Sequence, residues 1–448
     1  MERMQAKIIS YNVMGEEICA SAARISTTQG DAIETFEKAI DNANNQNLIK
    51  KVLSSGHKSL IEHAVFTIAM CNVSAYVEQF FIEFRLASFT IKSRRYVDFG
   101  EMGYYIPSDL SEEDAKCYHK YMDFLFQSYK TLVEQGVPKE DARFLLPYSF
   151  NSNFYCTINA RELAHIIRAI KFGRGYGITE LQDIANQIVE QIETLFPVLL
   201  YEFEEVQNRD DNLAASHSHP NVRDKTTFVE AQEMGVVELV ASPQKPKMVL
   251  DMASIISGSS EGVTDIKKLI DSKRPRELEH LVYTFRITNV SLSGITHIVR
   301  HRMQSIVVPS LQSIEHNRYI IPKSLQSFPI SLELYKKTLE YSGSIIAKLK
   351  GSTMFGRYGY YFAVSGSVMD IMTTINAREL LSFIKLRSCN RAQWEIQSIS
   401  CEILRQIRKH FPDLFIFYGP SCYSEKGCPE GRMACGKMEK TIDKFRKM

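Results

Sequence analysis

A long internal repeat constrains the fold of this chain more than any other feature of its sequence. Residues 157–163 recur without a change at 374–380, and residues 62–67 recur closely at 279–284, both at an offset of 217 positions (374 − 157). Residues 95–96 match 318–319 at an offset of 223 (318 − 95), so the second copy carries a local insertion. One hydrophobic core stops growing at roughly 250–300 residues. The 448 residues therefore predict two related domains in tandem.

The boundary between the domains is expected in a polar stretch near the middle of the chain. We assign residues 1–210 to the first domain, 211–230 to a linker, and 231–448 to the second domain, whose C-terminal tail contains cysteines. The stretch has no sustained apolar period, which is typical of a solvated linker. It also holds His217 and His219, for which a metal site is the alternative interpretation.

The spacing of apolar residues gives the same coarse order of elements in both halves. A β-rich run at 65–73, and again at 282–290, leads into an apolar helix expected at 76–85 and at 295–302. Amphipathic helices come late in each copy, at 159–170 and 180–195 and then at 376–387 and 393–410. Strands mixed with helices, without regular βαβ alternation, predict an α+β fold.

Composition excludes several classes of protein. With 44% hydrophobic and 24% charged residues, the chain has the make-up of a globular protein. No apolar run approaches the ~18 residues of a membrane helix, and the first ten residues do not have the form of a secretory signal. A net charge of +2 gives no reason to expect a nucleic-acid partner. Nine cysteines, an odd number, suit a reducing compartment, so we expect a cytoplasmic protein.

The sharpest local motif is the succession Arg300, His301 and Arg302. Two guanidinium groups beside an imidazole concentrate donors that suit a phosphate or a carboxylate. By itself such a triplet is more often a solvated basic face. Its interpretation therefore depends on the motifs found elsewhere in the chain.

Taken together, the other motifs resemble the flavin-dependent thymidylate synthases, also called thymidylate synthase complementing proteins. Residues 55–67 are similar to the family's Gly-His-x-Ser/Thr-x-x-Glu-His-x-x-Phe-Thr segment, and residues 300–305 to the start of its Arg-His-Arg-x-x-Ser motif. Residues 85–96 resemble the remainder of that motif, residues 143–147 its Arg-x-x-Leu-Pro segment, and residues 376–396 its C-terminal signature. The resemblance covers nearly the whole chain, once per half. It implies that each half is a mainly antiparallel sheet with flanking helices.

The two copies depart from the family pattern at complementary places. The first half lacks three residues that the second retains: Glu83, Phe84 and Ile170 stand opposite Arg300, His301 and Arg387. Conversely, residues 274–276 replace the segment of His57 in the second half, and Tyr360 stands opposite Arg143. We therefore expect the halves to combine into composite sites, in a homodimer that imitates the family's homotetramer.

The resemblance implies a role for each matching residue. For the flavin these residues are His57, Ser59, Glu62, Asn159, Arg161, Arg300, His301 and Arg302. For the nucleotide substrate they are Ser93, Arg95, Arg143, His297 and Arg387, with Ser313 as a secondary candidate. Ser93 and Arg387 are the expected catalytic residues. Ser93 has no partnered base nearby in sequence and would orient the pyrimidine, whereas Arg387 could stabilise negative charge that develops on the ring.

The implied reaction is methylation of dUMP to dTMP. Methylenetetrahydrofolate would donate the carbon, FAD would carry methylene and hydride, and NADPH would be the reductant. Residues 90–92 stand where the family usually has Asn-Glu-x before Ser93. That difference keeps two alternatives open: methylation of another pyrimidine nucleotide such as UMP, and binding of flavin or nucleotide without catalysis.

Some candidate residues also have a purely structural interpretation. His63 and His280 precede β-rich runs and could be core histidines. Asn159 and Asn376 could simply cap helices, and the glycine-rich residues 173–177 are expected to form a turn between helices rather than a phosphate loop. Cys422, Cys428 and Cys435 lack the paired spacing of a zinc site, so no metal is expected.

Overall fold

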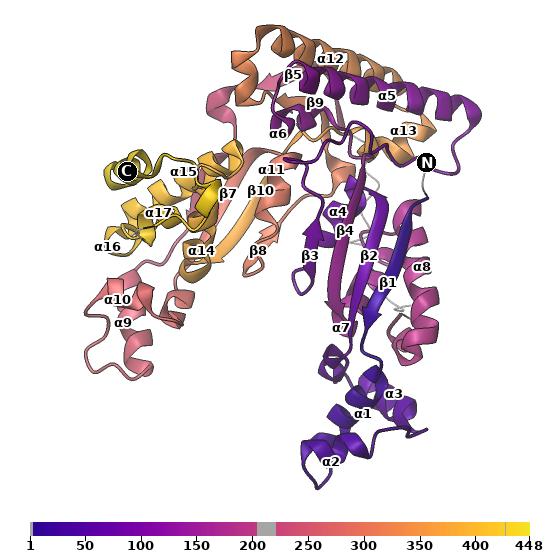
Figure 1. Cartoon of the computed structure of the whole chain (residues 1–448), viewed down its shortest axis with the longest axis vertical. Coiled ribbons are helices and arrows are strands. Elements are labelled where there is room, and N and C mark those ends of the chain that lie inside the picture. The colour runs from indigo at the N-terminus through magenta and orange to yellow at the C-terminus, as the bar shows by residue number, and fades with distance from the viewer. Residues whose placement is uncertain (1–2, 204–220, 426) are drawn as a thin grey trace. The chain divides into compact units, whose positions relative to one another are not determined.

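The computed structural model describes residues 3–203, 221–425 and 427–448, and these fall into two compact units (Figure 1). Unit 1 consists of Met1–Asn221, Leu311–Ser313 and Lys348–Val364. Unit 2 consists of Val222–Ser310, Ile314–Ala347 and Ser365–Met448. Each unit is built around one copy of the repeat.

Unit 1 contains a four-stranded antiparallel sheet in the order β1-β2-β4-β3. Its strands are β1 (Gln5–Tyr11), β2 (Val65–Ser74), β3 (Ser88–Ile91) and β4 (Asn151–Asn159). In the central pair, Phe66 lies opposite Ile158, and both are buried. Alternate residues of β4 are buried, because successive side chains of a strand point to opposite faces.

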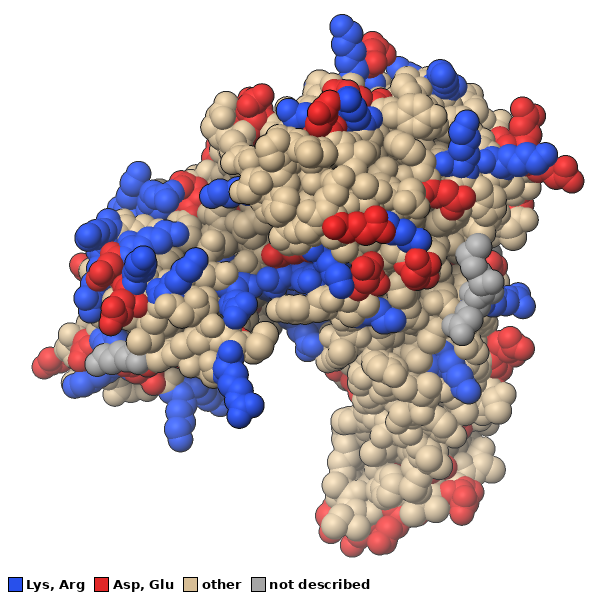
Figure 2. Space-filling model, turned by 45° about the horizontal axis from the view of Figure 1, so that its top comes forward, with Lys and Arg blue, Asp and Glu red and all other residues tan. Residues whose placement is uncertain are grey.

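Helices supply the rest of unit 1. They are α1 (Gly15–Ile25), α2 (Ala32–Glu37), α3 (Asn45–Ser54), η1 (Lys58–His63), α4 (Ala75–Ile82), α5 (Glu112–Glu134), α6 (Lys139–Ala142), η2 (Arg143–Leu145), α7 (Ala160–Lys171), α8 (Thr179–Leu195) and η3 (Pro197–Phe203). The long helix α8 packs on β1, where Gln187 and Gln191 accept hydrogen bonds from backbone N–H groups of the strand. Acidic side chains gather at the tip of unit 1 that carries α2 (Figure 2).

Unit 2 repeats the sheet of unit 1. Strands β6 (Val236–Ala241), β7 (Val282–Ser291), β10 (Val368–Asn376) and β8 (Gln304–Val307) pair antiparallel in the order β6-β7-β10-β8. A separate two-stranded sheet joins β5 (Asn221–Val229) to β9 (Glu315–Ile320). The prediction of two tandem α+β domains with antiparallel sheets is confirmed.

Helices also supply much of unit 2. They are η4 (Ala231–Glu233), α9 (Pro246–Ile256), α10 (Ile266–Asp271), η5 (Arg276–His280), α11 (Leu292–Ile298), η7 (Lys323–Ser327), α12 (Pro329–Leu349), α14 (Ala377–Arg387), α15 (Trp394–His410), α16 (Pro412–Phe415), α17 (Ser421–Ser424), η9 (Gly431–Met433) and α18 (Met438–Lys447). Helix α12 runs two residues past the end of this part of unit 2. None of the described helices is long and apolar enough to cross a membrane.

In both units the same buried contact fixes the start of one helix, α4 after β2 in unit 1 and α11 after β7 in unit 2. Ser74 ends β2, and its N–H and hydroxyl both donate to the carboxylate of Glu180, at 2.7 and 2.6 Å. Ser291 and Glu395 repeat this arrangement in unit 2. A Cβ on Gly294 would lie 2.9 Å from Glu395 Oε2, so glycine is needed beside this carboxylate.

One segment of the second copy belongs to unit 1. Within residues 348–364 lie α13 (Thr353–Tyr358) and η8 (Gly359–Phe362). The Tyr148 N–H donates to the Ala363 carbonyl at 2.7 Å, and the Tyr361 hydroxyl donates to Glu180 at 2.6 Å. Compact units therefore do not follow the boundary of the repeat at every point.

The predicted linker of residues 211–230 lies partly outside the described residues. From residue 221 onward its described part is the strand β5, which pairs with β9. Residues 222–229 do not alternate between apolar and polar side chains, so the apolar period gives no signal for this strand. His217 and His219 lie outside the described residues.

Candidate functional site

In unit 2, one histidine contacts two other residues of interest. His301 and Arg387 are candidate site residues, and Glu379 belongs to the repeated residues 374–380. Helix α14 begins after Asn376, whose side-chain oxygen accepts from the Glu379 N–H at 2.9 Å. Glu379 is in the first turn of this helix and Arg387 is its last residue. His301 lies between them: its Nδ1 is 3.0 Å from Glu379 Oε1, and its Nε2 accepts from Arg387 Nε at 2.9 Å.

The partners of the ring define its protonation state. A guanidinium can only donate, so Nε2 of His301 must carry the lone pair. The ring proton is then on Nδ1, and it is donated to Glu379. Burial lowers the pKa of His301, although the carboxylate of Glu379 opposes that effect. The neutral Nδ1–H tautomer is therefore the stable form near neutral pH.

The basic residues on either side of His301 are exposed. The predicted helix over 295–302 is wrong in its end, because α11 stops at Ile298 and the chain turns toward β8. A backbone hydrogen bond from the His301 N–H to the Ile298 carbonyl closes this turn. As a result, Arg300 and Arg302 are exposed while His301 is buried, and His297 is half-buried on α11. Ser313 is exposed and belongs to unit 1.

Unit 1 brings together the first half's predicted flavin residues around one exposed ion pair. Arg161, near the start of α7, lies 2.5 Å from Glu62 in η1, and both side chains are exposed. His57 and Ser59, just before and within η1, are also exposed. The chain reaches His57 through Gly56, whose φ of +86° is in the left-handed region that favours glycine. Glu279 and Arg378 form the equivalent pair in unit 2.

The expected capping roles of two asparagines are confirmed. The side-chain oxygen of Asn159 accepts from the Glu162 N–H at 2.9 Å, as Asn376 does for Glu379. A capping oxygen leaves the side-chain amide as a donor, so capping does not exclude a second role.

The first half's predicted nucleotide residues meet at Glu140. Arg95 Nε lies 2.5 Å from the Glu140 carboxylate, and Arg143 Nε donates to the Glu140 carbonyl at 2.9 Å. Arg143 is buried, and burial together with the nearby Arg94 lowers its pKa to about 10. The Ser93 hydroxyl accepts from the Arg95 N–H at 3.3 Å. Ser93, Arg95 and Arg143 therefore lie in one cluster.

Sequence reasoning missed two residues that support this cluster. Glu140 carries no motif signal, and only its place one turn before Arg143 could have pointed to it. Arg94 lies between two candidates but faces inward, where it forms a buried ion pair with Glu78. Glu78 also accepts from the Ser152 hydroxyl.

The first copy fills its equivalent of the His301 site with its own side chains. Phe84 replaces the histidine, and Arg174 forms an ion pair with Glu83. The Arg174 guanidinium lies over the rings of Phe80 and Phe84, with its Cζ 4.5 and 5.1 Å from their centroids. The prediction that 173–177 is a turn is confirmed, because Gly175 donates back to the Ala169 carbonyl between α7 and α8.

Two histidines that could have belonged to the core lie at the surface. His63 and His280 are exposed, so their interpretation as core histidines is wrong: each ends a short 3-10 helix at the surface. Cys422 has a raised pKa, chiefly from burial, and Cys389, Cys428 and Cys435 raise it further. Among the described residues, no group of three or more ligating side chains is placed to hold a metal ion.

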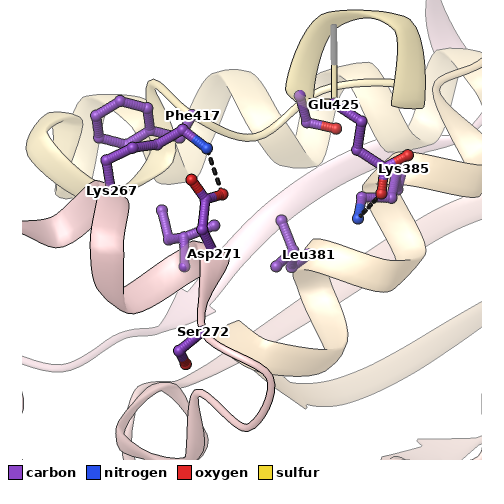
Figure 3. A pocket seen from close by; sticks show the side chains of 9 residues that line it. Lys267, Asp271, Ser272, Leu381, Lys385, Phe417 and Glu425 are labelled. Atoms are coloured by element: carbon purple, nitrogen blue, oxygen red, sulfur yellow. Dashed lines mark hydrogen bonds and ion pairs between the residues drawn. The ribbon is translucent and has the colours of Figure 1, made fainter. Parts of the chain in front are cut away.

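A small pocket of unit 2 contains none of the predicted site residues (Figure 3). It has a volume of about 270 Å³ and lies between α10, α14 and α17. Figure 3 shows Lys267 directed at Asp271 and Lys385 near Glu425, which matches their ion pairs. Charges that neutralise each other in this way do not favour a charged ligand.

Comparisons with known proteins agree with the duplicated organisation. The family model described as thymidylate synthase complementing protein matches residues 7–198 and 238–413. A flavin-dependent thymidylate synthase of Clostridium tetani is 28% identical over 47% of this chain and 96% of its own length. Another, from Pyrococcus horikoshii, is 31% identical over 42% of this chain and 79% of its own length.

Solved structures are similar over about half of the chain. A UMP/dUMP methylase, PolB, from Streptomyces cacaoi has a TM-score of 0.39 at 23% identity, and covers 45% of this chain and 95% of its own. The two regions matched by the family model together span most of the sequence. The chain therefore belongs to the thymidylate synthase complementing protein family, with two copies of the family domain in tandem.

Proposed function

We propose that the chain is a flavin-dependent thymidylate synthase that methylates dUMP at C5 to form dTMP. The one-carbon donor is methylenetetrahydrofolate and the reductant is NADPH. The observation that carries the proposal is the series Glu379–His301–Arg387 in unit 2, which holds an arginine by its Nε–H while leaving its charge intact. A fixed guanidinium can stabilise negative charge that develops on a pyrimidine ring.

The exposed basic residues fit FAD by their chemistry. Its diphosphate needs donors that stay charged at all physiological pH values, and Arg300 and Arg302 are two exposed guanidiniums. Arg161, paired with Glu62, adds a third beside the exposed His57 and Ser59. When bound, FAD would supply the one-carbon and hydride transfer; the chain would bind and orient the reactants.

We propose composite sites, in which each copy supplies what the other has lost. The first copy retains the cluster of Ser93, Arg95 and Arg143, whereas the second has Tyr360 opposite Arg143. The second copy retains the His301 series, whereas Arg174 and Phe84 fill its counterpart in the first. A functional site that needs both sets can form only once per chain, and a homodimer would then carry two.

Methylation of UMP is the alternative that a specific observation favours. Residues 90–92, which end β3 and lead to Ser93, lack the Asn-Glu of the family pattern. The Lys92 N–H donates to the Asn153 carbonyl at 3.1 Å, so this segment is tied to β4. The glutamate of the family's Asn-Glu is thus missing beside the cluster of Ser93, Arg95 and Arg143, where its carboxylate could contact the sugar or the base.

Purified protein decides between these possibilities. A yellow protein whose flavin is bleached by NADPH, and reoxidised only with methylenetetrahydrofolate and dUMP, supports thymidylate synthesis. The same behaviour with UMP and not dUMP supports the alternative. A colourless protein that does not bind added FAD would refute both activities.

Flavin stoichiometry tests the composite site separately. Titration with FAD, followed by its visible absorbance, should saturate at one equivalent per chain. Arg300→Ala and Arg161→Ala variants should each weaken the same binding event, with Arg378→Ala, the counterpart in the other copy, as the matched control. Two equivalents per chain would contradict composite sites while leaving the activity possible.

A further inference from the structure

Three residues of α14 form a stripe on which His301 lies. Glu379, Phe383 and Arg387 are spaced four residues apart, so they lie on one face of the helix. The His301 ring meets the Phe383 ring edge to face, with centroids 4.8 Å apart. The two ends of the stripe are about 12 Å apart along the helix axis at 1.5 Å per residue. The His301 imidazole connects them, because it lies against Phe383 and hydrogen-bonds to both ends.

The two hydrogen bonds of the ring depend on each other. Arg387 Nε can only donate, so its contact exists only when Nε2 of His301 carries no proton. That condition places the proton on Nδ1, which then needs an acceptor. The carboxylate of Glu379 is that acceptor, at 3.0 Å from the ring nitrogen. Without it, the tautomer that accepts from Arg387 would bury an unsatisfied N–H.

We propose that Glu379 is a positioning residue for Arg387: it holds the Nδ1–H tautomer of His301, and the ring in turn fixes the direction of the guanidinium. The inference rests on the proposed function, because positioning matters only if Arg387 faces a reacting ligand. Its physical basis is the second layer of hydrogen bonds that orients a functional side chain through an imidazole.

The first copy offers a natural comparison. Glu162 is the counterpart of Glu379, with the same capping asparagine before it. Its partners are different, since the Leu86 N–H donates to it at 3.4 Å and His165 Nδ1 lies 3.5 Å away. Phe84 and Ile170 stand opposite His301 and Arg387, so the same series of hydrogen bonds cannot form in the first copy. A glutamate in the first turn favours the start of the helix in both copies. The hydrogen bonds through the imidazole are retained in the second copy and lost in the first.

The test combines a spectroscopic and a kinetic measurement on the full chain. Protein labelled with ¹⁵N-histidine is compared as wild type, Glu379→Ala, Glu379→Gln and the matched control Glu162→Ala, with His301→Asn to assign the signal. In wild type the His301 spectrum should show a bare Nε2 and a protonated Nδ1. Glu379→Ala should lose this pattern, whereas Glu379→Gln should keep it, because the amide oxygen still accepts.

Turnover of dUMP should follow the tautomer. We expect kcat to fall ~10–100-fold in Glu379→Ala, the range seen when an orienting partner is removed, with rescue in Glu379→Gln and no effect in Glu162→Ala. A Glu379→Ala protein that keeps both the bare Nε2 and its turnover would overturn the proposal. So would equal losses in Glu379→Ala and Glu379→Gln, since the charge would then matter rather than the position. If wild type shows no turnover, the proposed function fails, and the nitrogen spectrum still decides the tautomer.

Discussion

At the scale of single residues, two buried carboxylates of unit 1 show how the same chemical group can take different roles. Glu78 is paired with Arg94, and the pair is almost completely buried. Glu180 has no arginine or lysine among its partners in the part of the chain described, and it receives hydroxyl and amide donors instead. Stability should therefore respond differently to a change at each of them.

Removal of Arg94 should destabilise unit 1 strongly. Arg94→Met leaves Glu78 buried without its cation, which typically costs about 3–5 kcal/mol. Urea denaturation followed by circular dichroism measures the loss. The double variant Arg94→Met with Glu78→Gln should recover part of it, because no uncompensated charge remains. An unchanged midpoint in the single variant would contradict the buried ion pair.

Glu180 should make the stability of unit 1 depend on pH. Burial raises its pKa from 4.5 to about 7, against the hydrogen bonds from Ser74 and Tyr361. Since the folded chain then keeps the proton to higher pH than the unfolded chain, the free energy of unfolding falls as pH rises from 4.5 to about 7 and levels off above it. Glu180→Gln should flatten this slope, measured by denaturation at a series of pH values. Glu193→Gln, an exposed change on the same helix, should not.

At the scale of elements, each long central strand contains a bulge that depends on one asparagine. Asn72 in β2 and Asn289 in β7 both have a φ of +53°, at the places where pairing with β4 and β10 shifts register. The Asn72 N–H donates to Asn153 Oδ1 at 3.1 Å, and the Asn289 N–H donates to Asp370 Oδ1 at 3.0 Å. Asparagine tolerates this left-handed conformation better than other residues with a Cβ.

The bulge predicts a specific pattern of tolerance at position 72. Asn72→Gly should change the free energy of unfolding little, because glycine adopts positive φ without strain. Asn72→Val should cost about 1–2 kcal/mol, the cost of the left-handed region for a residue of this kind. Thermal denaturation of the two variants compares them. Equal losses in both would mean that the side chain, and not the backbone, holds the bulge.

Sequence spacing predicted the elements that depend on local signals. The late helices α7, α8, α14 and α15 lie close to the predicted ranges, since apolar period and asparagine caps are properties of neighbouring residues. The end of α11 was missed, because what stops it is the return of the chain into β8. Glu140 and Arg174 were missed as well, since their partners are distant in sequence, and only folding brings them together.

At the scale of the whole chain, the repeat and the compact unit are not the same thing. Residues 348–364 descend from the second copy, yet Tyr361, Phe362 and Val364 are buried in unit 1. The Tyr121 hydroxyl donates to the Phe362 carbonyl at 3.0 Å, and Arg357 pairs with Asp109 at 2.6 Å. Unit 1 thus takes part of its core from across the junction.

The first copy should therefore not fold when it is separated from the second. Residues 1–208 expressed alone should be insoluble or lack cooperative unfolding, because the groups that Phe362 and Val364 cover would be exposed. The same fragment produced together with residues 209–448 should be recovered as a stable complex. Size-exclusion chromatography and thermal scans distinguish these results; a monomeric, cooperatively folded 1–208 fragment would contradict the expectation.

Residues 348–364, which come from the second copy but belong to unit 1, have a consequence for how a duplicated gene of this kind can change. If both copies of a duplicated domain fold independently, a break between them leaves two stable proteins. Here Tyr361 completes the hydrogen bonds of Glu180, a residue encoded far upstream in the other copy. An upstream product made without the downstream copy would have a hole where Tyr361 belongs, so folding makes the first copy depend on the second.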